Sequence, residues 1–188
     1  ATYNNTATIT LGAGAVLKNY GGMSAVRISG GELIMEAGSI ICDDTVTDRI
    51  KGTKIDGADL SYYGPAGAVW LQGGTFTMEP DSKIDGLIGR AIYNEAGSVI
   101  VHGTIVGVKS DPDTDKDKRG DFWQETSGTV MHMRVNAKAT FGPTSVIDGQ
   151  GATLYGSAIS VLGNCELTMA EGSLVTGYSG GNVLDIGG

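Results

Sequence analysis

The chain repeats itself with a period of about twenty-three residues. The repeat is clearest when residues 67–86 (GAVWLQGGTFTMEPDSKIDG) are laid over residues 157–177 (SAISVLGNCELTMAEGSLVTG). About six partial or full copies align, each with three short segments of alternating polarity separated by glycine-rich corners. A fixed period of this length is typical of solenoids, in which one copy buries its apolar face only by stacking on the next.

Alternation within each segment separates interior from surface side chains, because successive residues of a strand point to opposite faces. The predicted inward columns are Val26, Val69, Ile92, Met131, Ile159 and Leu184; Ile9, Leu33, Phe76, Val99, Ala139 and Leu167; and Leu11, Met35, Met78, Val101, Phe141 and Met169. The third segment adds one dominant apolar residue per copy, at Leu17, Ile41, Ile84, Ile105, Ile147 and Val175. Stacked at about 4.8 Å, these residues form one continuous core.

The sequence therefore predicts an all-β fold, a right-handed parallel β-helix of about six turns with three short strands per turn. A left-handed hexapeptide solenoid would need a strict six-residue period, and helical periodicity is absent throughout. Two long insertions, residues 42–67 and 108–128, interrupt the period. Both leave from the corner between a third segment and the next first segment, so we expect them to emerge side by side.

The turns read roughly GGAV-x-x-x-GGTFTM-x-x-GS-x-I-x-G, and they resemble the right-handed β-helix repeats of large bacterial cell-surface and adhesin-like proteins. The resemblance covers residues 7–188 apart from the insertions. It implies a single β-helix domain over residues 1–188, a piece of a longer extracellular protein that is attached to the cell surface and has neighbouring domains. Pectate lyases, phage tailspikes and autotransporter passengers share this architecture, so the resemblance says less about activity than about fold.

Charge narrows the classes of partner. The formal net charge of -8 disfavours nucleic acid and anionic membranes, because both repel an acidic surface. No apolar run approaches the roughly eighteen residues that span a bilayer, so membrane insertion is not expected. Neutral sugars, proteins and cations remain as ligand classes. A non-catalytic adhesin or stalk module that binds a glycan or a host surface protein is the leading functional hypothesis.

Aromatic residues gather at the insertion corner and on the strand that follows it. The outward column of the first segment is Arg27, Trp70, Tyr93, His132, Ser160 and Asp185. Such a ridge suits a sugar chain, whose apolar ring faces stack on aromatic rings while its hydroxyls need polar partners; an extended peptide could also use it. The predicted ligand-binding residues are Arg27, Tyr62, Tyr63, Trp70, Tyr93, Phe122, Trp123 and His132. The alternative is that the long loops fold back over the ridge and the rings only pack loop against solenoid.

The second insertion carries the one cofactor candidate, calcium. Its alternating carboxylates are Asp111, Asp113, Asp115 and Asp117, followed by Asp121. Carboxylates spaced in this way can converge on a hard cation that takes six to eight oxygen ligands. The EF-hand pattern is not met, and Lys116, Lys118 and Arg119 offset the negative charge. The sequence favours a solvated loop over a calcium site, and no other cofactor is expected.

No set of catalytic residues has the order that its chemistry requires. The fragments that resemble polygalacturonase motifs, residues 43–51 and 102–103, occur in the wrong order. Residues 177–181 match G-x-S-x-G but fall at a solenoid corner rather than at a strand-to-helix turn. The alternative function is a polysaccharide lyase or hydrolase that uses carboxylates such as Asp85 and Asp148, which would lie two turns apart. Cys42 and Cys165 lie about four turns apart and should both be free.

Overall fold

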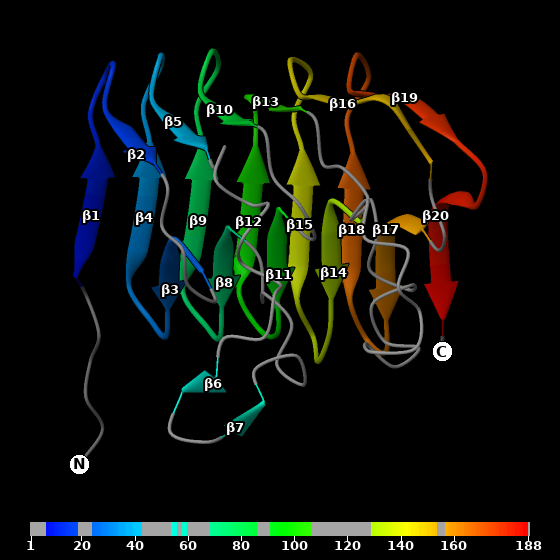
Figure 1. Cartoon of the computed structure of the whole chain (residues 1–188), viewed down its shortest axis with the longest axis horizontal. Helices are drawn as coiled ribbons and strands as arrows, with labels where there is room; N and C mark the ends of the chain where they lie inside the picture. The colour runs from blue at the N-terminus through cyan, green and yellow to red at the C-terminus, as the bar shows by residue number, and fades with distance from the viewer. Residues whose placement is uncertain are drawn as a thin grey trace.

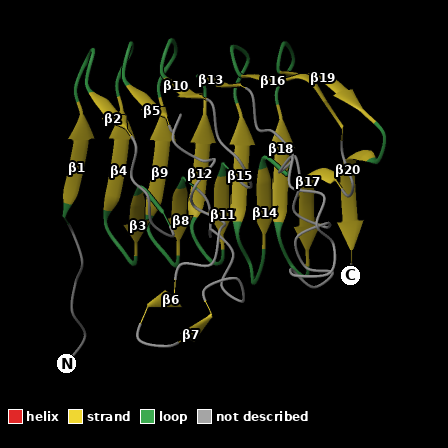
Figure 2. Ribbon diagram, viewed as in Figure 1, coloured by secondary structure: helices red, strands yellow, loops and turns green. Residues whose placement is uncertain are grey.

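The computed structural model describes residues 7–18, 24–42, 54–55, 58–59, 68–85, 91–106, 129–153 and 157–187. These residues form three parallel sheets of six strands, together with a two-stranded ladder. The successive turns stack along one axis, with β1 at one end and β20 at the other (Figures 1 and 2). The described residues contain no helix, and therefore none long and apolar enough to cross a membrane. The predicted right-handed parallel β-helix is confirmed.

The three sheets each take one strand from every turn. Sheet A has the order β1 (Thr8–Leu11), β4 (Glu32–Met35), β9 (Thr75–Met78), β12 (Ser98–Val101), β15 (Lys138–Phe141) and β18 (Glu166–Met169). Sheet B contains β2 (Val16–Lys18), β5 (Ile40–Cys42), β10 (Lys83–Asp85), β13 (Thr104–Val106), β16 (Val146–Thr153) and β19 (Leu174–Ser179). Sheet C contains β3 (Val26–Ile28), β8 (Val69–Leu71), β11 (Ile92–Asn94), β14 (Met131–Met133), β17 (Ser157–Leu162) and β20 (Asn182–Gly187).

Strand register follows the predicted columns. In sheet B, Leu17 pairs with Ile41, and the same column continues through every turn to Val175. In sheet A, Leu33 pairs with Phe76, and Met35 pairs with Met78. Because each inward residue lies directly over its counterpart, the columns form the single apolar core that the repeat predicts.

Burial of the core is complete only in the inner turns. Phe76, Phe141 and Ile84 are fully buried there, as the alternation predicts. At the two ends, Ile9, Met169 and Leu184 also lie in predicted inward columns, but their side chains are exposed. The reason is geometric: a residue in the first or last described turn has a neighbouring turn on one side only.

A recurring serine fixes the corner between sheets A and B. Ser39 donates its hydroxyl to Glu36 O at 2.6 Å, and its backbone N–H donates to the same carbonyl at 3.0 Å. Ser82 and Ser145 repeat this arrangement with Glu79 O and Gly142 O, and all three serines are buried. A short hydroxyl side chain therefore satisfies backbone groups that a tight buried corner would otherwise leave unpaired.

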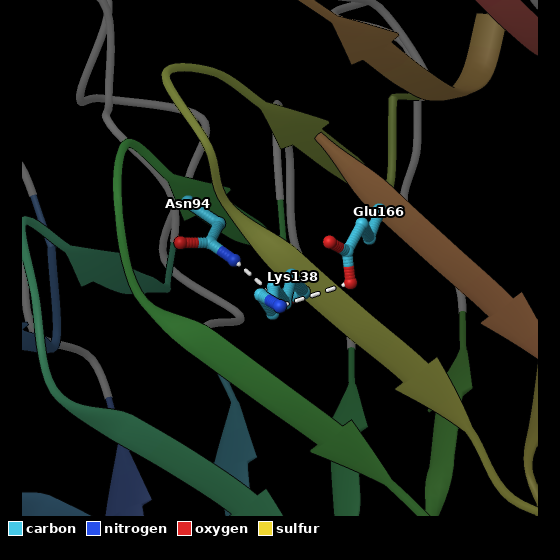
Figure 3. Close-up of polar contacts among 3 residues, drawn as sticks. All are labelled: Asn94, Lys138 and Glu166. Carbon is cyan, nitrogen blue, oxygen red and sulfur yellow. Dashed lines mark hydrogen bonds and ion pairs between the residues drawn. The ribbon is translucent and has the colours of Figure 1, made fainter. Parts of the chain in front are cut away.

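Asn94 interrupts one inward column of sheet C, between Leu71 and Met133. Its side chain is fully buried. The amide Nδ2 donates to Gly97 O and to Lys138 O, both at 3.0 Å, while Oδ1 accepts from Gly97 N at 2.8 Å. Figure 3 shows the amide turned toward Lys138, whose ammonium group contacts Glu166 at 3.0 Å. Asn94 thus links one turn to the next inside the solenoid.

The connections between sheets B and C carry both insertions, as predicted. The first lies between β5 and β8, and the second lies between β13 and β14. Within the first, β6 (Lys54–Ile55) and β7 (Ala58–Asp59) form an antiparallel ladder. The rest of both insertions lies outside the described residues.

Candidate ligand-binding face

Four of the predicted ligand-binding residues lie in one row on the outer face of sheet C. Arg27, Trp70, Tyr93 and His132 are the middle residues of β3, β8, β11 and β14, and each pairs in register with the next. Their side chains point outward because the residues on either side of them belong to the inward columns. We call Trp70, Tyr93 and His132 the aromatic column, with Arg27 at its end.

The rings of the aromatic column contact one another along the solenoid axis. The Trp70 and Tyr93 ring centroids are 6.4 Å apart with planes tilted by 38°, and those of Tyr93 and His132 are 5.5 Å apart at 33°. The Arg27 guanidinium lies 4.6 Å from the Trp70 centroid, in cation–π range. The rings are neither parallel nor perpendicular, so a ligand would meet both ring faces and ring edges.

A polar row borders the aromatic column at the corner between sheets C and A. It consists of Gln72, Glu95 and Arg134. Each of these residues donates a backbone hydrogen bond to the turn before it: Gln72 N to Ile28 O, Glu95 N to Leu71 O and Arg134 N to Asn94 O. Arg27 Nε donates to Gln72 Oε1 at 2.8 Å, and its Nη2 donates to the same oxygen. Arg134 Nη1 donates to the Tyr93 hydroxyl at 3.2 Å. The polar row therefore positions both Arg27 and Tyr93.

The charge of this edge is locally positive although the chain is acidic. The hydrogen bond and charge interaction with Tyr93 raise the pKa of Arg134, and Glu95 acts in the same direction. Arg27 and Arg134 are both exposed. Guanidinium groups are donors only, so this edge suits ligands that present oxygen acceptors.

The aromatic column is only partly open to solvent. Trp70, Tyr93 and His132 are half-buried, and Ser160, the next residue of the row, is buried. The indole Nε1 of Trp70 is shielded from solvent, and among the described residues it has no hydrogen-bond acceptor. Such an unpaired buried donor costs about 1–3 kcal/mol. The Trp70 side chain is therefore partly exposed, with its polar edge turned away from solvent.

The remaining predicted site residues lie outside the described part of the chain. Tyr62, Tyr63, Phe122 and Trp123 belong to the insertions, and so do the carboxylates at positions 111, 113, 115, 117 and 121. Calcium binding by the second insertion stays a prediction. Among the described residues, no group of three or more His, Cys, Asp or Glu side chains is placed to hold a metal ion.

The carboxylates of the alternative enzymatic hypothesis are separated as the repeat predicts. Asp85 pairs with Val106, which pairs in turn with Asp148, so the two acids lie two turns apart. Asp85 forms an ion pair with Lys83 at 2.6 Å, and Asp148 Oδ1 accepts from Gln150 N at 2.9 Å. Both groups already have partners within their own turn.

The other sequence fragments also lie apart. His102 follows β12 at the corner between sheets A and B, whereas His132 lies on sheet C. The G-x-S-x-G match lies on β19 and the corner after it, with no helix beside it in the described residues. Cys42 and Cys165 are both free, as predicted. The repeat predicts that position 42 begins the first insertion, but Cys42 is instead the last residue of strand β5.

Tyr178 on β19 interacts electrostatically with Asp148 on the paired strand β16, and its buried hydroxyl has no hydrogen-bond partner among the described residues. Burial, reinforced by the Asp148 charge, raises the pKa of Tyr178. The unfolded chain, where a tyrosine titrates near 10, therefore ionises first as pH rises. Ionisation of Tyr178 therefore leaves the free energy of unfolding unchanged below about pH 10 and lowers it as the pH rises above that value.

Replacing Tyr178 with Phe should raise the free energy of unfolding at pH 8 by about 1 kcal/mol, because an unpaired hydroxyl leaves the interior. The variant should also lose less stability than the parent between pH 8 and pH 11. Urea unfolding at both pH values measures the two effects. Tyr93→Phe is the matched control, since its hydroxyl accepts from Arg134, and it should not gain stability. A Tyr178→Phe variant that loses stability at pH 8 contradicts the assignment.

Together, the three sheets, the register and the outward row define a right-handed parallel β-helix with an aromatic and basic strip on one face. No protein-family model, curated protein sequence or solved structure matches the chain. The repeat predicts the aromatic column but not the polar row. The one signal for that row is position: Gln72, Glu95 and Arg134 each come two residues after an aromatic-column residue.

Proposed function

We propose that this chain is a non-catalytic extracellular module of a bacterial surface protein, an adhesin or stalk, that binds a glycan along the aromatic column. The observation that carries the proposal is the registered row of Arg27, Trp70, Tyr93 and His132, bordered by the polar row. From Arg27 to His132 the row spans three strand spacings, about 14 Å, which suits a short stretch of an extended chain.

The chemistry of the row supports a sugar ligand in two ways. Indole, phenol and imidazole rings provide apolar surface against which pyranose rings can pack. Arg27, Arg134 and Gln72 add donors and one amide oxygen for hydroxyl or carboxylate groups along the same line. An extended segment of a host surface protein is the second ligand class that this row could accept. We also propose that the module is attached to the cell surface and has neighbouring domains in the same protein.

A glycan array with the full chain, followed by titration of the best hit, tests this proposal. Trp70→Ala and Tyr93→Ala should each weaken binding by roughly tenfold or more, because each removes a ring from the row. Tyr93→Phe keeps the ring and should have a smaller effect. Thr140→Ala is the matched control, since Thr140 is exposed on the outer face of sheet A, and should bind as the parent does.

Reducing-sugar release from the same polysaccharides distinguishes a binding module from an enzyme. Product that disappears in Asp85→Asn or Asp148→Asn would replace the proposal with the lyase or hydrolase alternative. Binding that survives both ring variants would move the ligand to another face. Failure to bind any glycan or host protein would leave only a stalk role.

A further inference from the structure

The two arginines of the candidate site are held by neutral oxygens. Arg27 donates to the Gln72 amide oxygen, and Arg134 donates to the Tyr93 hydroxyl. Neither guanidinium forms an ion pair with a carboxylate among the described residues, whereas Lys83 on sheet B pairs with a carboxylate at 2.6 Å. Both arginines are exposed. A guanidinium carries more N–H donors than these contacts use, so both groups can donate further hydrogen bonds to a ligand.

The two guanidinium groups reach toward neighbouring turns from opposite sides. Arg27 belongs to β3 and Arg134 follows β14, so their backbones lie three turns apart. Arg27 reaches forward to the turn of β8, where its guanidinium lies 4.6 Å from the Trp70 ring centroid. Arg134 reaches back to the turn of β11, where it contacts the Tyr93 hydroxyl at 3.2 Å. Because Trp70 and Tyr93 pair in register, the two positive charges contact adjacent turns.

We propose that the glycan bound by the aromatic column is acidic, and that Arg27 and Arg134 bind the carboxylate of a uronate or a sialate. This inference rests on the proposed function, because it names the class of sugar that the same site binds. Ring packing explains a bound pyranose, but it does not explain two guanidinium groups that contact adjacent turns, where like charges repel. A carboxylate removes this repulsion and can accept two parallel N–H donors from a planar guanidinium.

The net charge of -8 does not oppose an acidic sugar at this site, because salt screens exposed charges beyond about 8 Å at physiological ionic strength. The local charges are therefore the ones that matter. Glu95 of the polar row interacts electrostatically with Arg134, and together with Arg27 these residues carry one net positive charge.

The acids near the arginines also limit how many carboxylates the ligand can carry. Glu95 lies in the polar row between the turns of Arg27 and Arg134, and Asp185 lies two strands beyond His132 in the outward row. A chain with a carboxylate on every sugar would place negative charges beside both acids. The site therefore favours a glycan in which acidic sugars are separated by neutral ones.

Titration of the full chain with matched oligosaccharides tests the proposal. The probes are a hyaluronan oligosaccharide, in which uronates alternate with neutral sugars, and sialyllactose, each compared with the same compound after its carboxyl groups are reduced to alcohols. The carboxylate form of at least one pair should bind about tenfold more tightly than its reduced form, and the pair that responds identifies a uronate or a sialate. This advantage should shrink as salt is added. An oligouronate of equal length without neutral sugars should bind more weakly than the hyaluronan probe.

Variants of the charged residues locate the carboxylate. Arg27→Gln and Arg134→Gln should each remove most of the advantage of the carboxylate form, whereas Trp70→Ala should weaken binding of both forms. Glu95→Gln removes a neighbouring negative charge and should strengthen binding of the carboxylate form. Lys83→Gln is the matched control, because it changes the net charge as the arginine variants do but lies on sheet B, and it should bind as the parent does. Thermal unfolding checks that each variant is folded.

The outcomes separate this inference from the proposed function. Equal binding of the carboxylate and reduced forms, with loss of both in Trp70→Ala, overturns the acidic ligand and leaves a glycan-binding module. A carboxylate preference that survives in both folded arginine variants also overturns the inference, because the anion then binds elsewhere. Tighter binding of the oligouronate than of the hyaluronan probe contradicts the separation of acidic sugars. Failure of every glycan to bind removes the inference and the proposed glycan binding together.

Discussion

Gly74→Ala is expected to lower the free energy of unfolding by about 3 kcal/mol. Gly74 has φ of +79°, a conformation that L-residues with a side chain adopt at a cost. A Cβ at this position would also lie 2.4 Å from Gly31 O in the turn before. That neighbour is backbone and belongs to the ladder, so it cannot move aside without disturbing the stack. Left-handed strain and the steric clash therefore add.

The two causes can be separated with a matched control. Gly14 has φ of +76°, but a Cβ there meets nothing within 4 Å. Gly14→Ala should therefore cost only the conformational term, about 1–2 kcal/mol. Urea unfolding followed by circular dichroism measures both variants. Equal losses would contradict the close approach between turns as a source of the Gly74 effect.

Most of the fold follows from the repeat because a parallel solenoid applies one constraint many times. Once Ile41 and Ile84 are assigned to equivalent positions, the pairing of their strands and the identity of the core column are determined together. Alternation then decides which neighbours point outward. For this reason the sequence predicted the register of all three sheets and placed Trp70 and Tyr93 in one outward row.

Side-chain exposure at the ends and side-chain contacts at the corners could not be predicted from the sequence, because they do not depend on the period of the repeat. Exposure of Ile9 and Leu184 depends on whether a further turn covers them, and alternation alone cannot show this. Gln72 and Arg134 lie in corners, where side chains are free of the strand constraint, so their contacts with Arg27 and Tyr93 depend on rotamers. The shielding of the Trp70 indole Nε1 likewise depends on side-chain packing, which the period does not determine.

Asn94 is the clearest case of a residue whose role the repeat conceals. In the AIYN segment it ends a strand, at a position that is apolar in the neighbouring turns, Leu71 and Met133. A buried amide there is tolerated because its three hydrogen bonds satisfy both of its polar atoms. Two of those bonds close the corner at Gly97, and the third reaches Lys138 in the next turn (Figure 3).

Asn94→Ala is accordingly expected to lower the free energy of unfolding by about 3 kcal/mol, because the buried Gly97 N–H loses its acceptor and a cavity opens. Asn94→Leu should recover little of this loss, since a side chain of similar volume fills the cavity but leaves the N–H unpaired. Asn164→Ala, at an exposed corner, is the control and should change stability by less than about 0.5 kcal/mol. If Asn94→Leu proves as stable as the parent, apolar packing rather than hydrogen bonding holds this turn to the next.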